Sequence, residues 1–257
     1  MELIKQVTTW IITWATTYYH SKSQHFITSL SQCILCQGKC QNLPLICQYC
    51  CADLPYISSS AKKQSSQEYS HESLLLSPKV SSNISHKNID DLYCLTTYQW
   101  PLNTWLNQLK YQHKFELAKL IANIINRHFE SLLETLKSEQ YVIIAMPIHI
   151  TRWQERGFNQ SHLIARQLAN LSGITYQPDL IVRHKKTESQ VGKDGAARRK
   201  NIKGAFKVVN LEGLPDHIII VDDVVTTGTS GNELAHLLKK SGVLKVTLLT
   251  AAIALKI

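Results

Sequence analysis

Residues Ile218 to Ser230 read IIIVDDVVTTGTS, and this stretch decides the fold of the chain. Its apolar start, Ile218 to Val221, predicts a strand buried on both faces, as in a parallel sheet. Asp222 and Asp223 follow at the carboxyl end of that strand, and residues 232–240 then have the periodicity of an amphipathic helix. Ligands of open parallel sheets bind outside the carboxyl ends of the strands, so the stretch also predicts a binding site.

Strand and helix patterns alternate along the chain from Asp91 onward. Alternation of apolar strands with helices predicts a parallel sheet covered by helices on both faces. We therefore expect an α/β domain over residues 91–257. Its expected strands are 141–147, 206–209, 218–221 and 245–254, and its expected helices are 106–125, 161–171 (with Gly173 as a C-cap) and 232–240.

The turn from Thr226 to Ser230 has the composition of a phosphate cradle. Backbone N–H groups at a helix N-terminus bind anions, and Gly228 lets the backbone approach a ligand closely. The hydroxyls of Thr226, Thr227, Thr229 and Ser230 add donors without charge, which suits a monophosphate. Asp222 and Asp223 would repel a phosphate and suit ribose hydroxyls or a hydrated Mg²⁺. The pattern predicts a site for a phosphorylated pentose; the alternative is an acidic strand end followed by a capped helix.

Basic residues occur in two further places. Arg152 and Arg156 follow the strand at 141–147, so their guanidinium groups can reach the same crevice and suit a pyrophosphate, or they lie on the surface of the next helix. Residues 183–203 hold eight Lys and Arg against Glu188 and Asp194. That segment suits a mobile hood over a polyphosphate; a solvated loop and a nucleic-acid-binding arm are the alternatives.

Six of the seven cysteines lie between Cys33 and Cys51. The spacing of the paired C-x-x-C motifs lets four thiolates converge on one Zn²⁺ in a segment too small to hold a core. All four ligands would come from the protein, so the zinc would be structural; a redox pair is the alternative. Cys94 is expected to be a small buried residue, and Cys40 could exchange with a ligand. The predicted ligands are Cys33, Cys36, Cys47 and Cys50.

The remaining composition bounds the class of protein. The chain has 257 residues, of which 44% are apolar, and that fraction excludes a wholly disordered chain. A net charge of +9 favours a polyanionic partner. The apolar run Val7 to Tyr19 is too short to span a bilayer, so we expect a cytoplasmic protein, with peripheral association at the inner face of the membrane left open.

Four regions follow from these patterns. We expect an N-terminal helical extension at 1–32, a four-cysteine zinc module at 33–56, a Ser-rich linker at 57–90 and the α/β domain at 91–257. The linker region is too polar to offset its ordering entropy by burial.

The stretch IIIVDDVVTTGTS resembles the phosphoribosyl-pyrophosphate (PRPP) binding motif of type I phosphoribosyltransferases. Within that superfamily, other segments resemble the ComF family, also called competence protein F or GntX-like. The resemblance covers about residues 33–257, without the Ser-rich linker. The residues that carry it are Pro147, Arg152 and Arg156 to Gln160, then Gln190, Arg198 and Asn201, and the tripeptide Leu109-Lys110-Tyr111.

The resemblance implies a PRPP-binding site with a type I phosphoribosyltransferase-like fold. Asp222 and Asp223 would hold ribose hydroxyls, residues 226–230 the 5-phosphate, and Mg²⁺ would accompany the PRPP. The pyrophosphate would contact Arg152, Arg156, Lys193 and Arg198.

Two functions are compatible with the resemblance. The first is a role in natural transformation, in which the protein handles incoming single-stranded DNA together with proteins of the uptake machinery. The second is a Mg²⁺-dependent transferase that passes ribose 5-phosphate to an unidentified acceptor. Because the sequence stops at Ile257, just after the last expected strand, little chain is left for an acceptor-binding hood, and we favour the first. Its candidate base-stacking residues are Tyr49, Trp100, Trp105 and Trp153.

Overall fold

The computed structural model describes residues 32–41, 43–57, 71–185 and 202–254. The chain forms two compact units, residues 1–54 and 55–257. The expected N-terminal helical extension, including Val7 to Tyr19, lies outside the described residues. None of the described helices combines the length and apolar character needed to cross a bilayer.

The smaller unit is organised around the cysteines. Its helix α3 spans Gln48–Ala52, and Cys47 is the N-cap. An antiparallel bridge joins Gln32 to Lys39, and the N–H of Ile34 donates to the carbonyl of Leu45 at 2.9 Å. These contacts bring the two C-x-x-C segments together without a sheet or a long helix.

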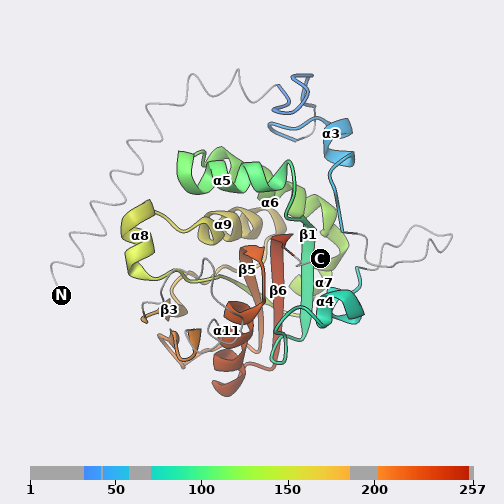
Figure 1. Ribbon diagram of the computed structural model, residues 1–257. Helices are drawn as coiled ribbons and strands as arrows, with labels where there is room; N and C mark the ends of the chain where they lie inside the picture. The colour runs from blue at the N-terminus through green and yellow to red at the C-terminus, as the bar shows by residue number, and fades with distance from the viewer. Residues whose placement is uncertain (1–31, 42, 58–70, 186–201, 255–257) are drawn as a thin grey trace. The chain divides into compact units, whose positions relative to one another are not determined.

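The larger unit contains a four-stranded parallel sheet (Figure 1), which confirms the predicted fold class. The strand order is β1-β6-β5-β2, and every neighbouring pair is parallel. The central strand β5 is apolar on both faces over its first half, because Ile218 to Val221 are fully buried. The strands are β1 (Asp91–Thr97), β2 (Val142–Ala145), β5 (His217–Val225) and β6 (Lys245–Ile253).

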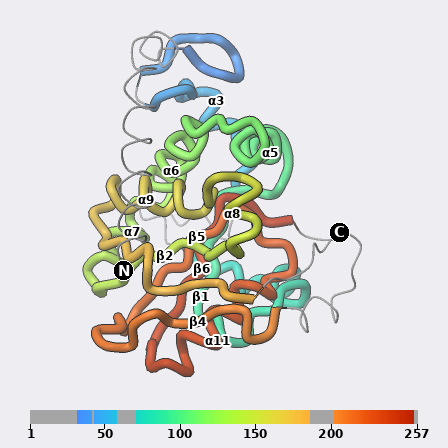
Figure 2. The backbone as a smooth tube through the Cα atoms, turned by 90° about the vertical axis from the view of Figure 1, so that its left-hand side faces the viewer, coloured from blue at the N-terminus to red at the C-terminus, as the bar shows by residue number. Residues whose placement is uncertain are grey.

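Helices cover both faces of this sheet. Ile218 and Ile220 pack in one core cluster with Leu234 and Leu238 of α11. Since strand side chains alternate between faces, Ile219 faces the other side, where α9 contacts β5 and α6 contacts α9. Figure 2 shows α5, α6 and α9 on one side of the strands and α11 on the other. The helices are α5 (Leu102–Gln112), α6 (Glu116–His128), α7 (Glu130–Ser138), α8 (Ile150–Arg156), α9 (Gln160–Ser172) and α11 (Thr229–Lys240).

A separate antiparallel hairpin, β3 (Ile181–Arg183) and β4 (Phe206–Val208), packs on the α11 side of the sheet. The N–H of Gly204 donates to Oε1 of Glu233 on α11 at 2.7 Å. The sequence predicted a strand at 206–209 but not its antiparallel pairing. In the structure this strand pairs with β3 and lies outside the parallel sheet.

Three further expectations are corrected by the structure. The expected helix over 106–125 is two helices, because His113 adopts the left-handed conformation (φ 56°) and ends α5. The strand expected at 218–221 continues to Val225. The polar linker does not extend to residue 90, because residues 71–90 are folded.

The folded part of residues 71–90 consists of a short 3-10 helix, η1 (Leu74–Leu76), and α4 (Pro78–Ser81). Four of its apolar residues reach the sheet core, whereas Leu76 is 72% exposed. The buried members are Leu74, Val80, Ile84 and Ile89.

Candidate functional site

The acidic pair lies inside β5 and not after it. Asp222 is in register with Thr250 of β6, and β5 pairs with β6 as far as Val225. Asp222 is contacted by Ser161 at the start of α9, and Asp223 is contacted by Lys110 of α5. The two carboxylates therefore meet different neighbours although they are adjacent in sequence.

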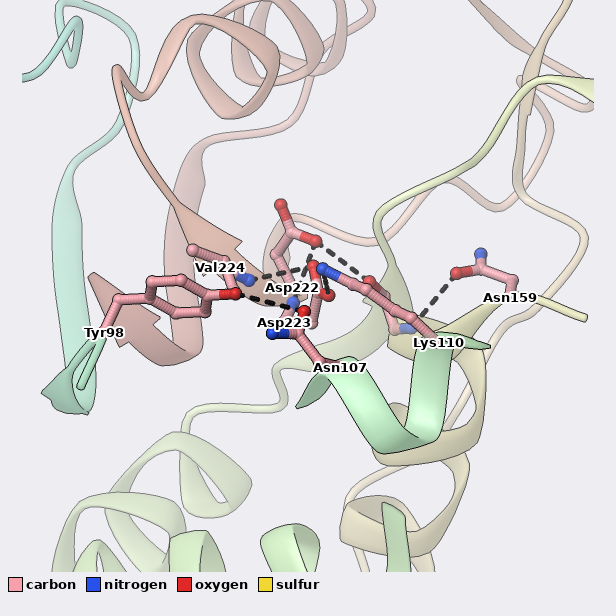
Figure 3. A network of polar contacts seen from close by, with 8 residues as sticks. Tyr98, Asn107, Lys110, Asn159, Asp222, Asp223 and Val224 are labelled. Atoms are coloured by element: carbon pink, nitrogen blue, oxygen red, sulfur yellow. Dashed lines mark hydrogen bonds and ion pairs between the residues drawn. The ribbon is translucent and has the colours of Figure 1, made fainter. Parts of the chain in front are cut away.

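Asp222 is held from the start of α9 (Figure 3). The hydroxyl of Ser161 donates to Oδ1 of Asp222 at 2.9 Å, and the N–H of Asp223 donates to the same oxygen at 2.9 Å. Ser161 is fixed by Asn159, the N-cap of α9, whose Oδ1 accepts from the N–H of Ser161 at 3.0 Å. Asn159 in turn donates to the carbonyl of Met146 at 3.0 Å, which ties α9 to the end of β2.

Asp223 is held from α5. The ammonium group of Lys110 forms an ion pair with Oδ2 of Asp223, and the N–H of Val224 donates to Oδ1 at 2.9 Å. One turn earlier on α5, Asn107 accepts a 3.4 Å hydrogen bond from the hydroxyl of Tyr98, which follows β1. Lys110 of α5 and Ser161 of α9 thus contact the acidic pair of β5, and Figure 3 shows Asn107 and Tyr98 beside it.

The electrostatics of this cluster differ between its members. Burial raises the pKa of Asp222 to about 7, and the neighbouring Asp223 charge adds to this, while the Ser161 hydrogen bond and Lys110 oppose it. Burial lowers the pKa of Lys110, but the Asp223 carboxylate outweighs burial and raises it overall. Lys110 therefore stays protonated at neutral pH, and Asp222 titrates near neutrality.

The turn from Thr226 to Ser230 leads directly into α11. Gly228 has φ +66° and is the N-cap of the helix, whose first residue is Thr229. The hydroxyls of Thr227 and Thr229 lie 2.9 Å apart and bond to each other. Thr226 is exposed, while Thr227 and Ser230 are partly exposed. The turn thus keeps the hydroxyls of Thr226, Thr227 and Ser230 accessible beside the first N–H groups of α11, whereas Thr229 is buried.

The arginines of α8 lie in two environments. The guanidinium of Arg156 stands 5.5 Å from the ring centroid of Tyr111. Burial lowers the pKa of Arg183 of β3, and the nearby charge of Arg152 lowers it further. The charge of Asp222 has the opposite effect on the pKa of Arg183. Arg152, Arg183 and Asp222 thus share one electrostatic neighbourhood.

The basic segment 183–203 lies mostly outside the described residues, and with it Lys193 and Arg198. Its two ends are described and lie together. The N–H of His184 donates to the carbonyl of Ala205 at 3.0 Å, and the ammonium group of Lys185 donates to the carbonyl of Lys203 at 3.3 Å. The segment therefore leaves and rejoins the domain at the β3-β4 hairpin, beside Arg183.

Other sequence candidates have structural roles or different exposure. His149, left open between a ligand contact and a cap, is the N-cap of α8 and accepts from the N–H of Thr151 at 3.2 Å. Trp105 was expected to be available for stacking, but it is 3% exposed and belongs to the core. The remaining stacking candidates are exposed: Tyr49 (73%), Trp100 (66%) and Trp153 (39%).

The four predicted zinc ligands converge. The Sγ atoms of Cys33, Cys36, Cys47 and Cys50 all lie within 4.8 Å of one another. The N–H of Gly38 donates to Sγ of Cys36 at 3.4 Å, and the N–H of Cys50 donates to Sγ of Cys47 at 3.4 Å. Such N–H to sulfur bonds stabilise thiolates, and four thiolates at this spacing fit a tetrahedral zinc ion.

Thiol acidity within the cluster is uneven. Burial raises the pKa of Cys33, but backbone hydrogen bonds from Cys36, Cys47 and Leu35 outweigh it and lower the pKa to about 6. Burial and hydrogen bonds with neighbouring cysteines raise the pKa of Cys50. Cys94, in the other unit, is buried and its thiol donates to the carbonyl of Thr96 at 3.1 Å, as expected for a structural residue.

Similar proteins of known name include competence and DNA utilization proteins. No family model matches the chain. Competence protein F of Haemophilus influenzae is 28% identical over 228 residues, which cover 87% of this chain and 91% of that protein. DNA utilization protein YhgH of Salmonella typhi is 33% identical over 159 residues, covering 59% of this chain and 66% of that protein. The chain belongs to the ComF family.

Two further proteins are less similar in sequence. Competence protein ComFC of Streptococcus pneumoniae is 25% identical over 164 residues, covering 64% of this chain and 66% of that protein. The similarity thus spans just under two thirds of the length of the YhgH and ComFC relatives. A hypoxanthine phosphoribosyltransferase structure from Trypanosoma cruzi aligns at 14% identity with a TM-score of 0.33, covering 50% of this chain and 63% of that one.

In this ComF-family chain the acidic pair does not fit a magnesium ion held by protein groups alone. Both Oδ1 atoms accept backbone N–H bonds, and Oδ2 of Asp223 pairs with Lys110. Mg²⁺ requires several oxygen ligands in octahedral geometry. Among the described residues, the four cysteines are the only group of three or more side chains that could hold a metal ion.

Three polar residues of the site were not predicted as such. In the sequence, Lys110 belongs to the tripeptide Leu109-Lys110-Tyr111, Ser161 begins an expected helix, and Arg183 begins a basic segment. Lys110 comes after the apolar residues of a helix, and a lysine at that position is also typical of an exposed helix surface. Its partner, Asp223, is more than a hundred residues away in sequence, and no local signal connects the two.

Proposed function

We propose that the chain binds PRPP or a related phosphoribosyl ligand at the carboxyl end of β5. The observation that carries this proposal is the juxtaposition of Asp222, a hydroxyl-binding carboxylate, with the turn from Thr226 to Ser230 at the start of α11. A sugar phosphate needs both an anion cradle and acceptors for its hydroxyls, and the strand-turn-helix provides them in sequence.

The pyrophosphate of such a ligand would lie on the basic side of the acidic pair. Arg152 supports this placement because its charge acts on the same neighbourhood as Asp222. Arg156, Lys193 and Arg198 are proposed to complete this side, the last two from the segment that closes at the β3-β4 hairpin. Guanidinium groups suit this role because they bind phosphate oxygens in a bidentate manner.

In the cell, we propose a role in natural transformation on the cytoplasmic side of the membrane. Relatives of this chain are named competence proteins and DNA utilization proteins. The net charge of +9 and the exposed Tyr49, Trp100 and Trp153 support contact with incoming single-stranded DNA, through phosphate pairing and base stacking. Proteins of the DNA-uptake machinery are its proposed partners.

Ligand binding and transformation can be tested with one pair of variants. Asp222→Asn keeps the shape of the site but removes its charge, and Asp216→Asn is the control, because Asp216 is exposed just before β5. Titration calorimetry with PRPP is expected to show at least a roughly tenfold weaker affinity for Asp222→Asn only, together with a lower transformation frequency in cells. Unchanged PRPP affinity would reject the site, and lost affinity with normal transformation would reject a ligand-dependent role in uptake.

Transfer of ribose 5-phosphate to an acceptor is the second candidate. It is favoured by one observation, namely that burial raises the pKa of Asp222 to about 7, since acid-base groups of enzymes are often tuned toward neutrality. Incubation of the protein with PRPP, Mg²⁺ and a panel of nucleobases and amines tests it. Pyrophosphate release that depends on both an acceptor and Asp222 would establish catalysis, and release with no acceptor dependence would reject transfer.

A further inference from the structure

Lys110 occupies a fixed position beside the acidic pair. It lies on α5 at the edge of the helix face that Leu102, Leu106 and Leu109, all fully buried, anchor in the core. Its side chain is 18% exposed and that of Asp223 is 13% exposed, so the ion pair is largely removed from water. An ion pair shielded in this way is screened less than a surface pair.

The oxygen atoms of the two aspartates are used unequally. Oδ1 of each aspartate accepts the N–H of the residue that follows it, and Oδ2 of Asp223 takes the ammonium group of Lys110. Among hydrogen bonds within the described part of the chain, none uses Oδ2 of Asp222. One carboxylate oxygen of the pair, Oδ2 of Asp222, is thus left for a ligand.

We propose that Lys110 is a positioning residue which neutralises Asp223, so that the acidic pair accepts an uncharged ribose hydroxyl at Asp222 and not a free divalent cation. This inference rests on the proposed phosphoribosyl site and assigns its specificity. It gives the two aspartates different roles: Asp222 contacts the sugar, and Asp223 is the counter-ion of Lys110.

The charge arithmetic explains the selectivity. With Lys110 present, the three side chains carry at most one net negative charge, and the nearby Arg183 guanidinium offsets part of it. That charge is too small to replace the hydration shell of Mg²⁺. A hydroxyl carries no charge and needs a single acceptor, which Oδ2 of Asp222 supplies. Without Lys110, two adjacent carboxylates would repel each other and attract a cation instead.

The test measures ligand discrimination and not affinity alone. Ribose 5-phosphate, 2-deoxyribose 5-phosphate and MgCl₂ are titrated separately into the full chain and into Lys110→Met, Lys110→Arg and Lys119→Met. Lys119 is an exposed lysine of α6 and serves as the matched control. If Lys110→Met does not fold, as judged by its thermal unfolding transition, Lys110→Gln takes its place.

The natural chain and Lys119→Met are expected to bind ribose 5-phosphate at least about tenfold more tightly than the deoxy sugar, the loss typical of one hydrogen bond to a charged group. Lys110→Met should reduce that ratio below about threefold and increase the affinity for Mg²⁺ alone about tenfold. Lys110→Arg should restore both values, because it keeps the charge.

The outcomes separate the two proposals. If the natural chain binds neither sugar phosphate, the proposed function fails. If it binds them and Lys110→Met keeps both the ribose preference and the weak affinity for Mg²⁺, the phosphoribosyl site stands and the role of Lys110 is wrong. A uniform loss of affinity for both sugars, with no gain in Mg²⁺ binding, would also overturn it, because that is the effect of a merely structural lysine.

Discussion

The N–H of Ser85 donates a 2.8 Å hydrogen bond to the carbonyl of Thr227, so the segment before β1 supports the turn before α11. The next residue of the turn, Gly228, also packs against this segment. A Cβ atom on Gly228 would lie 2.3 Å from Cγ2 of Ile84 and 2.7 Å from the carbonyl oxygen of Ser85. The proposed phosphate cradle therefore has one face built against residues that are far away in sequence.

Gly228→Ala is expected to destabilise the protein more than a left-handed glycine substitution alone would. Gly228 and Gly213 have similar φ values, +66° and +72°, but Gly213 has no heavy atom within 4 Å of an added Cβ. Gly213→Ala should reduce the free energy of unfolding by about 1 kcal/mol, from backbone strain. Gly228→Ala should cost roughly 2 kcal/mol more, because backbone atoms must move. Equal losses in urea unfolding would contradict the contact with Ser85.

Much of the fold could be predicted from the sequence because its strands are continuous apolar runs. Residues 218–221 and 245–254 have the continuous apolar character of strands in a buried parallel sheet. Residues 71–90 could not be placed, because the six aliphatic residues of this Ser-rich stretch have no period. Only the finished core shows that Leu74, Val80, Ile84 and Ile89 bury against it. Local composition alone therefore does not indicate that such a segment is folded.

Acid should destabilise the larger unit through His128. The ring of His128 stacks on Tyr56 with centroids 4.5 Å apart, and burial lowers its pKa to about 4, with the charge of His71 as a second cause. The unfolded chain binds this proton below about pH 6.5, and the folded chain resists it until about pH 4. The free energy of unfolding therefore falls as pH drops from about 6.5, by about 2 kcal/mol at about pH 5.

Urea unfolding at about pH 7.5 and about pH 5 checks this dependence. His128→Phe keeps a ring on Tyr56 without a titrating group, so its loss of stability between the two pH values should be smaller than that of the natural chain by about 2 kcal/mol. His236→Phe, on the exposed face of α11, is the control. The same loss in all three proteins would show that His128 is not responsible.

The smaller unit is expected to hold one zinc ion per chain. Replacing both Cys36 and Cys47 by Ser should abolish metal binding and unfold this unit, since a segment of this size lacks a core of its own. Cys40→Ser is the internal control, because Cys40 lies outside the group of four converging thiols. Elemental analysis of the purified proteins measures the outcome. Metal retained in the double variant, or lost in Cys40→Ser, would contradict the assigned ligands.

Single-stranded DNA binding is expected to weaken steeply with salt. Each phosphate contact contributes about −0.7 to the slope of log K against log salt for single strands. Replacing Arg198, Arg199 and Lys200 by Gln should therefore make the slope less steep by about 2, as measured by fluorescence anisotropy with a labelled oligonucleotide. The control replaces the exposed Lys114 and Lys119 by Gln. A flat salt response of the natural chain would reject phosphate pairing.

The candidate site was predictable only in its contiguous part. Asp222 and the turn at 226–230 are adjacent in sequence, so strand-turn-helix reasoning locates them together. Lys110 and Ser161 reach the same carboxylates from α5 and α9, and their residue types also suit an exposed helix surface. Trp105 was misplaced for the related reason that an aromatic residue at the start of a helix fits both a stacking surface and a core.

A crystal structure of the chain with ribose 5-phosphate bound tests the central claim most directly. The account predicts the phosphate within hydrogen-bond distance of the backbone N–H groups and hydroxyls of residues 226–230, with a ribose hydroxyl on Oδ2 of Asp222. A phosphate bound elsewhere, with the turn packed by the protein's own side chains and Asp222 free of the sugar, would contradict it.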